Sequence, residues 1–169
     1  DYSIGGNKYH FYNALTSLPT TIRYESSGYW HPRPNQQATI NAFKTAVENG
    51  RTNLLMYAVM RFGKSFTSMC CAKEMNDGNG ARLVVVVSAK ADVKEEWRKT
   101  VECADNFRND YEFLSSVDLD SNYKIVSDTL EKDEDAKNVV LFLTLQDLQG
   151  EVIKDKHQQI FGREVDLLI

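Results

Sequence analysis

Apolar positions along this chain alternate between short continuous runs and longer segments with a helical period. These mostly apolar runs lie within residues 54–59, 82–88, 112–114, 139–144 and 165–169, and each range is a candidate strand. Apolar residues three or four positions apart predict helices at 36–48, 64–75, 91–104 and near 145–160, with a polar helix and loop in 119–135. Continuous apolar strands that alternate with helices are typical of a parallel sheet covered on both faces, so the pattern predicts an α/β fold.

The residues before and after the first predicted helix suggest its ends, and the start of the chain lies outside the alternation. Asn35 is a suitable N-cap for the first helix, and Asn49-Gly50 is a suitable stop. Residues 1–33 are rich in aromatic side chains and follow neither period, apart from a possible short helix at 11–17. We therefore expect two parts: a lead-in segment, 1–33, that packs on the domain, and an α/β domain, 34–169.

Composition narrows the class of protein. The chain has 169 residues, of which 42% are hydrophobic and 26% charged, as expected for one globular domain. Its net charge of -4 gives no overall basic field, although a local basic face is compatible with it. The three cysteines and three histidines lack metal-ligand spacing, so we expect reduced thiols and no histidine-rich metal site. Every apolar run is too short to span a membrane.

The most informative stretch is Gly63-Lys64-Ser65, which lies between the apolar run 54–59 and a predicted helix. A strand, a tight loop that ends in Gly-Lys-Ser and a following helix form the plan of a phosphate-binding loop. Backbone N–H groups and the helix N-terminus favour an anion, while the lysine reaches phosphates and the hydroxyl holds Mg²⁺. Ala58 occupies the position of the first glycine of the full pattern. The alternative is an ordinary strand-to-helix turn with a solvated lysine.

Two polar residues mark the ends of predicted strands. Ser88 follows the run that ends at Val87, and Thr144 follows the run that ends at Leu143. Ligands of parallel sheets bind at the carboxyl ends of the strands. We therefore expect Ser88 and Thr144 to lie beside the phosphate-binding loop.

Four stretches together resemble the first RecA-like motor domain of a superfamily 2 helicase or translocase, most closely the motor subunits of type I and type III restriction enzymes. They are Arg33-Pro34-Asn35-Gln36-Gln37, Met60-Arg61-Phe62-Gly63-Lys64-Ser65, Val87-Ser88-Ala89-Lys90 with Trp97, and Leu143-Thr144-Leu145-Gln146-Asp147-Leu148. The resemblance implies a three-layer, parallel-sheet RecA-like domain of the phosphate-loop NTPase class. Met60-Arg61-Phe62 replaces the usual small loop residues, and Ala89 replaces a proline.

The same resemblance implies ATP and Mg²⁺ as ligands. Gln36 corresponds to the residue that reads adenine, Lys64 to the catalytic lysine and Ser65 to the metal ligand. The residues expected to surround the nucleotide are Arg33, Gln36, Arg61, Phe62, Gly63, Lys64, Ser65 and Phe66. The residues expected to contact the backbone of double-stranded DNA are Ser88, Lys90, Thr144 and Gln146.

Residues 165–169 are similar to the strand that leads into the Asp-Glu box of such motors, so we expect the chain to be a fragment of a longer protein. The resemblance implies a second RecA-like domain and a nuclease domain in the same polypeptide, in the bacterial cytoplasm, as a restriction enzyme that translocates DNA. Phosphoryl transfer needs the acidic residues and an arginine as well as this loop, so we expect the chain alone to bind nucleotide with negligible hydrolysis. Alternatives are an RNA helicase or chromatin-type remodeller, a phosphate-loop kinase, and a non-catalytic interaction domain.

Overall fold

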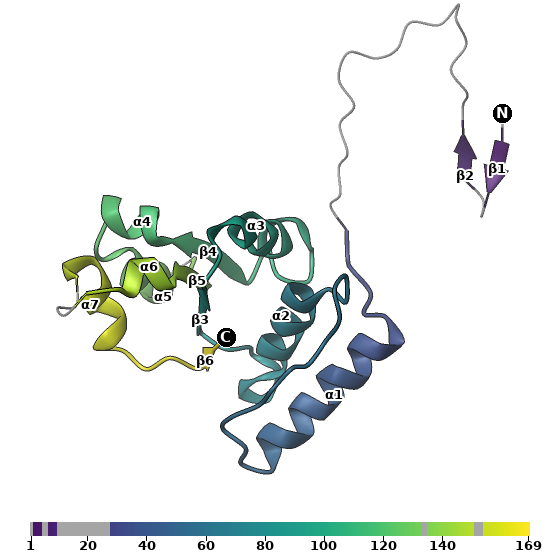
Figure 1. The fold of residues 1–169 in the computed structure, drawn as a ribbon, viewed down its shortest axis with the longest axis horizontal. Helices are drawn as coiled ribbons and strands as arrows, with labels where there is room; N and C mark the ends of the chain where they lie inside the picture. The colour runs from purple at the N-terminus through teal and green to yellow at the C-terminus, as the bar shows by residue number, and fades with distance from the viewer. Residues whose placement is uncertain (1, 5–6, 10–27, 133–134, 151–153) are drawn as a thin grey trace, which may run out of the picture.

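The computed structural model describes residues 2–4, 7–9, 28–132, 135–150 and 154–169. Its centre is a parallel sheet with the strand order β4-β5-β3-β6 (Figure 1). These strands are β3 (Leu83–Ser88), β4 (Tyr111–Ser115), β5 (Asn138–Thr144) and β6 (Leu167–Leu168). The helices are α1 (Pro34–Glu48), α2 (Lys64–Glu74), α3 (Lys94–Cys103), α4 (Ser116–Ser121), α5 (Ile125–Glu131), α6 (Leu145–Leu148) and α7 (Asp155–Phe161). The predicted α/β class is confirmed.

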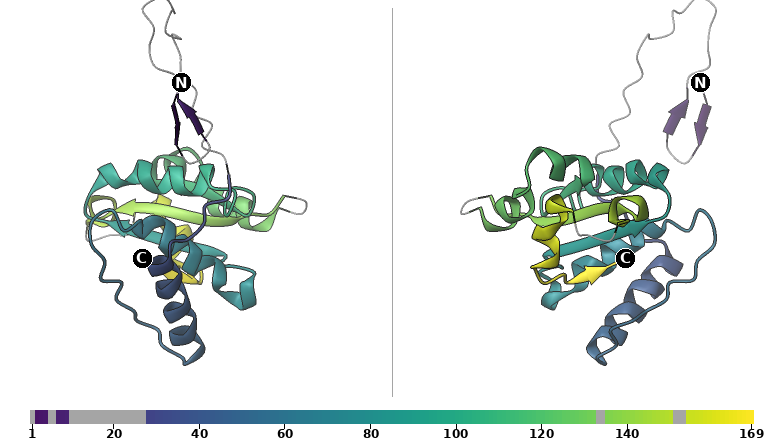
Figure 2. Two further views of the ribbon diagram at one scale, coloured as in Figure 1. Left: turned by 90° about the vertical axis from the view of Figure 1, so that its right-hand side faces the viewer. Right: turned by 60° about the vertical axis from the view of Figure 1, so that its left-hand side comes forward.

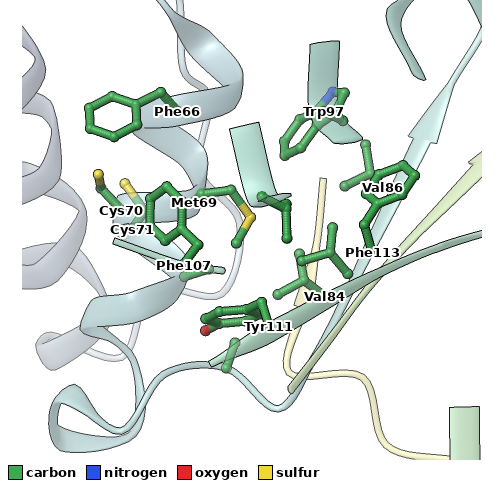
Figure 3. Close-up of a cluster of buried hydrophobic side chains, with 14 of the residues drawn as sticks. Phe66, Met69, Cys70, Cys71, Val84, Val86, Trp97, Phe107, Tyr111 and Phe113 are labelled. Atoms are coloured by element: carbon green, nitrogen blue, oxygen red, sulfur yellow. The ribbon is translucent and has the colours of Figure 1, made fainter. Parts of the chain in front are cut away.

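Both faces of the sheet are covered, as the continuous apolar strands predicted. On one face, α1, α2 and α3 enclose a core that includes Met69, Val84, Trp97 and Phe107 (Figure 3). On the other face, α4, α5 and α7 enclose a second core. Neighbouring residues of β3 alternate between the two cores, because successive side chains of a strand point to opposite faces. Figures 1 and 2 show α1 outermost, beside α2. The three-layer arrangement is confirmed.

Several predicted boundaries shift. The helix α1 begins at Pro34 with Arg33 as its N-cap, so Asn35 is not the cap, and proline suits the first helical position because its missing N–H has no partner to lose. The predicted helix 91–104 is a short 3₁₀ turn, Ala91–Val93, followed by α3. The predicted helix near 145–160 is two helices, α6 and α7. These differences leave the order of elements unchanged.

The predicted strand at 54–59 is wrong. Residues 51–59 have no regular secondary structure and run back from the end of α1 to the start of α2 as extended chain (Figure 1). Leu55 is 89% exposed and Tyr57 is 96% exposed, whereas Met56 packs against the core. A strand is stabilised by its neighbours, and β6, which lines the same pocket as Leu54 and Met56, is two residues long and does not pair with this run. High strand propensity alone is therefore not sufficient to make this run a strand.

The start of the chain is described only in part. Tyr2–Ile4 (β1) and Asn7–Tyr9 (β2) pair as antiparallel strands, and the expected helix at 11–17 lies outside the described residues. The Trp30 N–H donates to Asn106 Oδ1 (2.8 Å), and Asn106 Nδ2 donates to the Trp30 carbonyl (3.0 Å). The Trp30 ring contacts Phe66, with centroids 5.7 Å apart. Packing of the whole segment 1–33 on the domain stays a prediction.

The expected reduced thiols agree with the structure. All three cysteines are free, and burial raises the pKa of Cys70 to about 11 and that of Cys71 to about 12. Both lie on α2 in the first core, where they are protonated and unreactive at neutral pH (Figure 3). Across the described residues, no helix is long and apolar enough to cross a membrane.

Lowering the pH should destabilise the fold, because His157 on α7 is buried on the second face of the sheet. This side chain is 2% exposed, and within the described part of the chain its Nε2 has no hydrogen-bond partner. Burial is the largest cause of its lowered pKa, Lys156 and Lys154 act in the same direction, and Asp147 and Asp120 oppose them. The unfolded chain therefore binds this proton more tightly, so stability is lost as pH falls below about 6.5. Urea unfolding at several pH values should show a flatter dependence for His157→Leu; an unchanged dependence would contradict this role.

Candidate phosphate-binding site

The loop before α2 has the backbone conformation of an anion-binding turn. Gly63 is the N-cap of α2 and has a left-handed backbone, with φ of 85°. The first intrahelical bond runs from the Thr67 N–H to the Gly63 carbonyl (3.0 Å). The N–H groups of Lys64, Ser65 and Phe66 precede it and have no partner among the described residues. Three free donors at the positive end of a helix suit a phosphate.

Gln36 and Arg33 brace this loop from the start of α1. Gln36 is 5% exposed, its Nε2 donates to the Phe62 carbonyl (2.8 Å), and its Oε1 accepts from the Arg33 N–H (2.8 Å). The Arg33 guanidinium donates to the carbonyls of Phe62 and, at 3.2 Å, Arg61. Two residues predicted around the nucleotide, Arg33 and Gln36, are therefore joined to the loop backbone. These bonds span nearly 30 positions of sequence.

Close approach explains why glycine stands at position 63. A Cβ atom there would lie 2.6 Å from Gln36 Nε2, below the closest separation that such atoms adopt. Arg61 also has a left-handed backbone, with φ of 63°, which is uncommon for a residue with a side chain. The loop therefore keeps a tight turn although Met60-Arg61-Phe62 replaces smaller residues.

The lysine and serine of the motif lie as the sequence predicted, at the start of α2. Lys64 is exposed, and its Nζ donates to the Val59 carbonyl (3.0 Å), which closes the loop on itself. Ser65 is 5% exposed, and its hydroxyl donates to Glu96 Oε1 of α3 (2.7 Å). The ammonium group meets a neutral acceptor that a phosphate oxygen can replace.

Phe66 contributes to the core with its side chain. It is 8% exposed, and its ring lies 5.8 Å from that of Phe107 in addition to its contact with Trp30. Only the backbone N–H of Phe66 is therefore directed to the predicted nucleotide. The aromatic ring packs α2 against Phe107 in the first core (Figure 3).

An open cleft of about 690 Å³ connects this loop with the end of the sheet. Its lining comes from the loop, the end of β3 and the start of α3, and includes Gly63, Lys64, Ser65, Ser88 and Glu96. A cleft at the carboxyl end of a parallel strand is where ligands of such sheets bind. The predicted proximity of Ser88 to the phosphate-binding loop is confirmed.

The four residues predicted to contact nucleic acid occupy the same end of the sheet. Ser88 and Thr144 are register partners on β3 and β5. The Ser88 hydroxyl accepts from the Lys90 N–H (3.1 Å), and the Thr144 hydroxyl caps α6 by accepting from the Asp147 N–H (3.1 Å). Lys90 and Gln146 are exposed. The structure thus brings two hydroxyls together and leaves the two longer side chains in solvent.

Glu96 is the site residue that the sequence did not indicate. It lies next to another glutamate on an amphipathic helix and matches none of the four motif stretches. Its contact with Ser65 joins residues 31 positions apart. The spacing of apolar residues on α3 predicts which face packs on the sheet, but it does not predict which polar residue reaches the loop.

The fold and this loop define an α/β domain of the phosphate-loop class. A family model described as "Type III restriction enzyme, res subunit" matches residues 29–169, and the chain belongs to that family. The family comprises helicase-like motor domains of restriction enzymes, which confirms the resemblance that the four motif stretches carry. Searches of curated proteins and of solved structures returned no significant match.

Proposed function

We propose that this chain is the ATP-binding part of an ATP-dependent DNA translocase within a restriction enzyme. The observation that carries the proposal is the turn at Gly63, which presents the N–H groups of Lys64, Ser65 and Phe66 without a partner among the described residues. A polyphosphate with Mg²⁺ fits these N–H donors together with the Lys64 ammonium and the Ser65 hydroxyl. ATP and Mg²⁺ are the ligands that we assign to this cleft.

Each part of the cleft has a role in this proposal. The Lys64 ammonium leaves the Val59 carbonyl and binds the terminal phosphates, and the Ser65 hydroxyl turns from Glu96 to the metal ion. We assign the adenine base to Gln36. This residue would join the base to the loop, because its amide nitrogen already donates to the Phe62 carbonyl. When bound, Mg²⁺ neutralises charge that develops on the phosphates.

Double-stranded DNA is the partner that we propose for the end of the sheet. Exposed Lys90 and Gln146 flank the neighbouring hydroxyls of Ser88 and Thr144. These four side chains suit phosphate oxygens, so they would position a strand without reading its sequence. A second motor domain and a nuclease domain of the same polypeptide complete the proposed enzyme.

A titration with a fluorescent ATP analogue and Mg²⁺ tests the nucleotide site. We expect saturable binding that unlabelled ATP reverses more effectively than unlabelled GTP. Absence of saturable binding by the folded chain would overturn the proposal.

Gln36→Ala should weaken binding of the ATP analogue about tenfold, because it removes a buried hydrogen bond to the loop worth about 1 kcal/mol or more. We also expect it to reduce the preference for ATP over GTP. Gln37→Ala is the matched control, since Gln37 is exposed and its side-chain amide donates to Asn41 on the surface of α1 (2.9 Å). If Gln36→Ala weakens ATP and GTP equally and keeps the preference, Gln36 braces the loop without reading the base.

A further inference from the structure

Glu96, an exposed residue of α3, contributes a carboxylate to the lining of the proposed phosphate cleft. Its Oε1 accepts the Ser65 hydroxyl at 2.7 Å, and it lines the cleft together with Lys64 and Gly63. No other acidic side chain of the described residues lines this cleft. A negative charge at a site for a polyanion needs an explanation.

The position of Glu96 is fixed by the packing of α3. Trp97 is 8% exposed and Val101 is fully buried in the first core, so the helix cannot rotate without exposing them. The Thr100 hydroxyl donates to the Glu96 carbonyl (2.8 Å) within the same helix. The carboxylate is therefore held toward Ser65 by the fold.

The charge of Glu96 has opposite effects on the metal-free and the metal-bound polyphosphate. A carboxylate in a cleft repels a metal-free polyphosphate, and it attracts a divalent cation bound to that polyphosphate. Mg²⁺ is typically held by one or two carboxylates together with phosphate oxygens and waters. The 2.7 Å between Ser65 Oγ and Glu96 Oε1 is close to the separation of roughly 3 Å between neighbouring oxygens around an octahedral Mg²⁺.

We propose that Glu96 couples nucleotide binding to Mg²⁺ by disfavouring metal-free ATP and by holding the ion beside Ser65, directly or through a metal-bound water. The inference rests on the proposed nucleotide site. It adds to that site a residue that acts on the metal ion, and it gives the cleft a means to select the magnesium complex of the nucleotide.

The test is the dissociation constant of the fluorescent ATP analogue measured once with Mg²⁺ and once with EDTA. The ratio of the two constants reports the coupling. Glu96→Gln keeps an acceptor for the Ser65 hydroxyl and removes the charge, so we expect the EDTA-to-Mg²⁺ ratio to fall about tenfold, with tighter metal-free binding as part of the change. Glu95→Gln is the matched control, because it removes the same charge from the next residue, whose side chain is 71% exposed and pairs with Arg98. Its ratio should equal that of the wild-type chain.

Each outcome decides between the inference and the function on which it rests. An unchanged ratio in Glu96→Gln, or an equal loss of affinity with and without Mg²⁺, would overturn the coupling role. If the wild-type chain binds the analogue, Lys64→Ala weakens that binding and Glu96→Gln has the wild-type ratio, only the inference fails. If the wild-type chain does not bind, or Lys64→Ala binds as well as wild type, the nucleotide site fails and the inference with it.

Discussion

Gly63→Ala should destabilise the chain by about 2–5 kcal/mol and weaken binding of the ATP analogue more than tenfold. A left-handed backbone costs an alanine about 1–2 kcal/mol. The new methyl group also meets Gln36 Nε2 at 2.6 Å and displaces it from the Phe62 carbonyl, which adds about 1–3 kcal/mol for a polar group without its partner. Urea unfolding gives the free energy of unfolding, and the fluorescent titration gives the affinity.

Gly78→Ala separates the two contributions. Gly78 has nearly the same φ, 86° against 85° for Gly63, but a Cβ atom there would meet nothing within 4 Å. This control should lose only the backbone contribution and should bind the analogue normally. Equal losses of stability in the two variants, with normal binding in both, would show that the approach of Gln36 to the loop does not matter.

Local sequence was sufficient to predict the strands β3 and β5 and the helix α2, although it also predicted a strand at 54–59 that the structure lacks. The runs 82–88 and 139–144 are apolar on both faces, because both faces of β3 and β5 are buried by helices. Gly63, Lys64 and Ser65 are adjacent in sequence, so their place at the start of α2 follows from the motif and its flanking elements. The position of Ser88 follows in turn from the rule that ligands meet the carboxyl ends of strands.

Long-range contacts account for what the sequence did not predict. The run 54–59 has the composition of a strand, but pairing depends on which neighbour is present, and none of the described strands pairs with it. The bonds of Gln36 to the loop and of Glu96 to Ser65 join segments that are 26 and 31 positions apart. Side-chain type and spacing do not encode such pairs, whereas the packing of α1 and α3 around α2 brings them together.

The loop state seen here explains how a nucleotide would change the site. Lys64 and Ser65 are each bound to an internal acceptor, the Val59 carbonyl and the Glu96 carboxylate. A phosphate would give the Lys64 ammonium an anionic acceptor in place of a neutral carbonyl, and Mg²⁺ would take the Ser65 hydroxyl oxygen as a ligand in place of its hydrogen bond to Glu96. Arg33 and Gln36 hold the carbonyl groups of the loop on the opposite side. Binding can therefore exchange two side-chain contacts while the backbone of the loop stays in place.

We expect Lys64→Ala to bind the nucleotide more weakly without any loss in the free energy of unfolding. The lysine is exposed, and its bond to the Val59 carbonyl lies at the surface, so the free energy of unfolding should change little. Its bond to a phosphate is charge-assisted and worth about 1.5–3 kcal/mol, which predicts a decrease in affinity of about 10- to 150-fold. Titration of the fluorescent ATP analogue with Mg²⁺ measures the affinity, and urea unfolding measures the stability.

Lys44→Ala is the control for the removal of one positive charge. Lys44 lies on α1 and pairs with Glu74 at the surface (3.4 Å), away from the loop. It should bind the analogue like the wild-type chain, because exposed ion pairs contribute little and act only over short distances in salt. Equal affinity of Lys64→Ala and Lys44→Ala would mean that the ammonium group of Lys64 does not reach the phosphates. A loss of affinity in Lys64→Ala alone would show that the position of Lys64 in the loop matters for binding, since the two variants carry the same net charge.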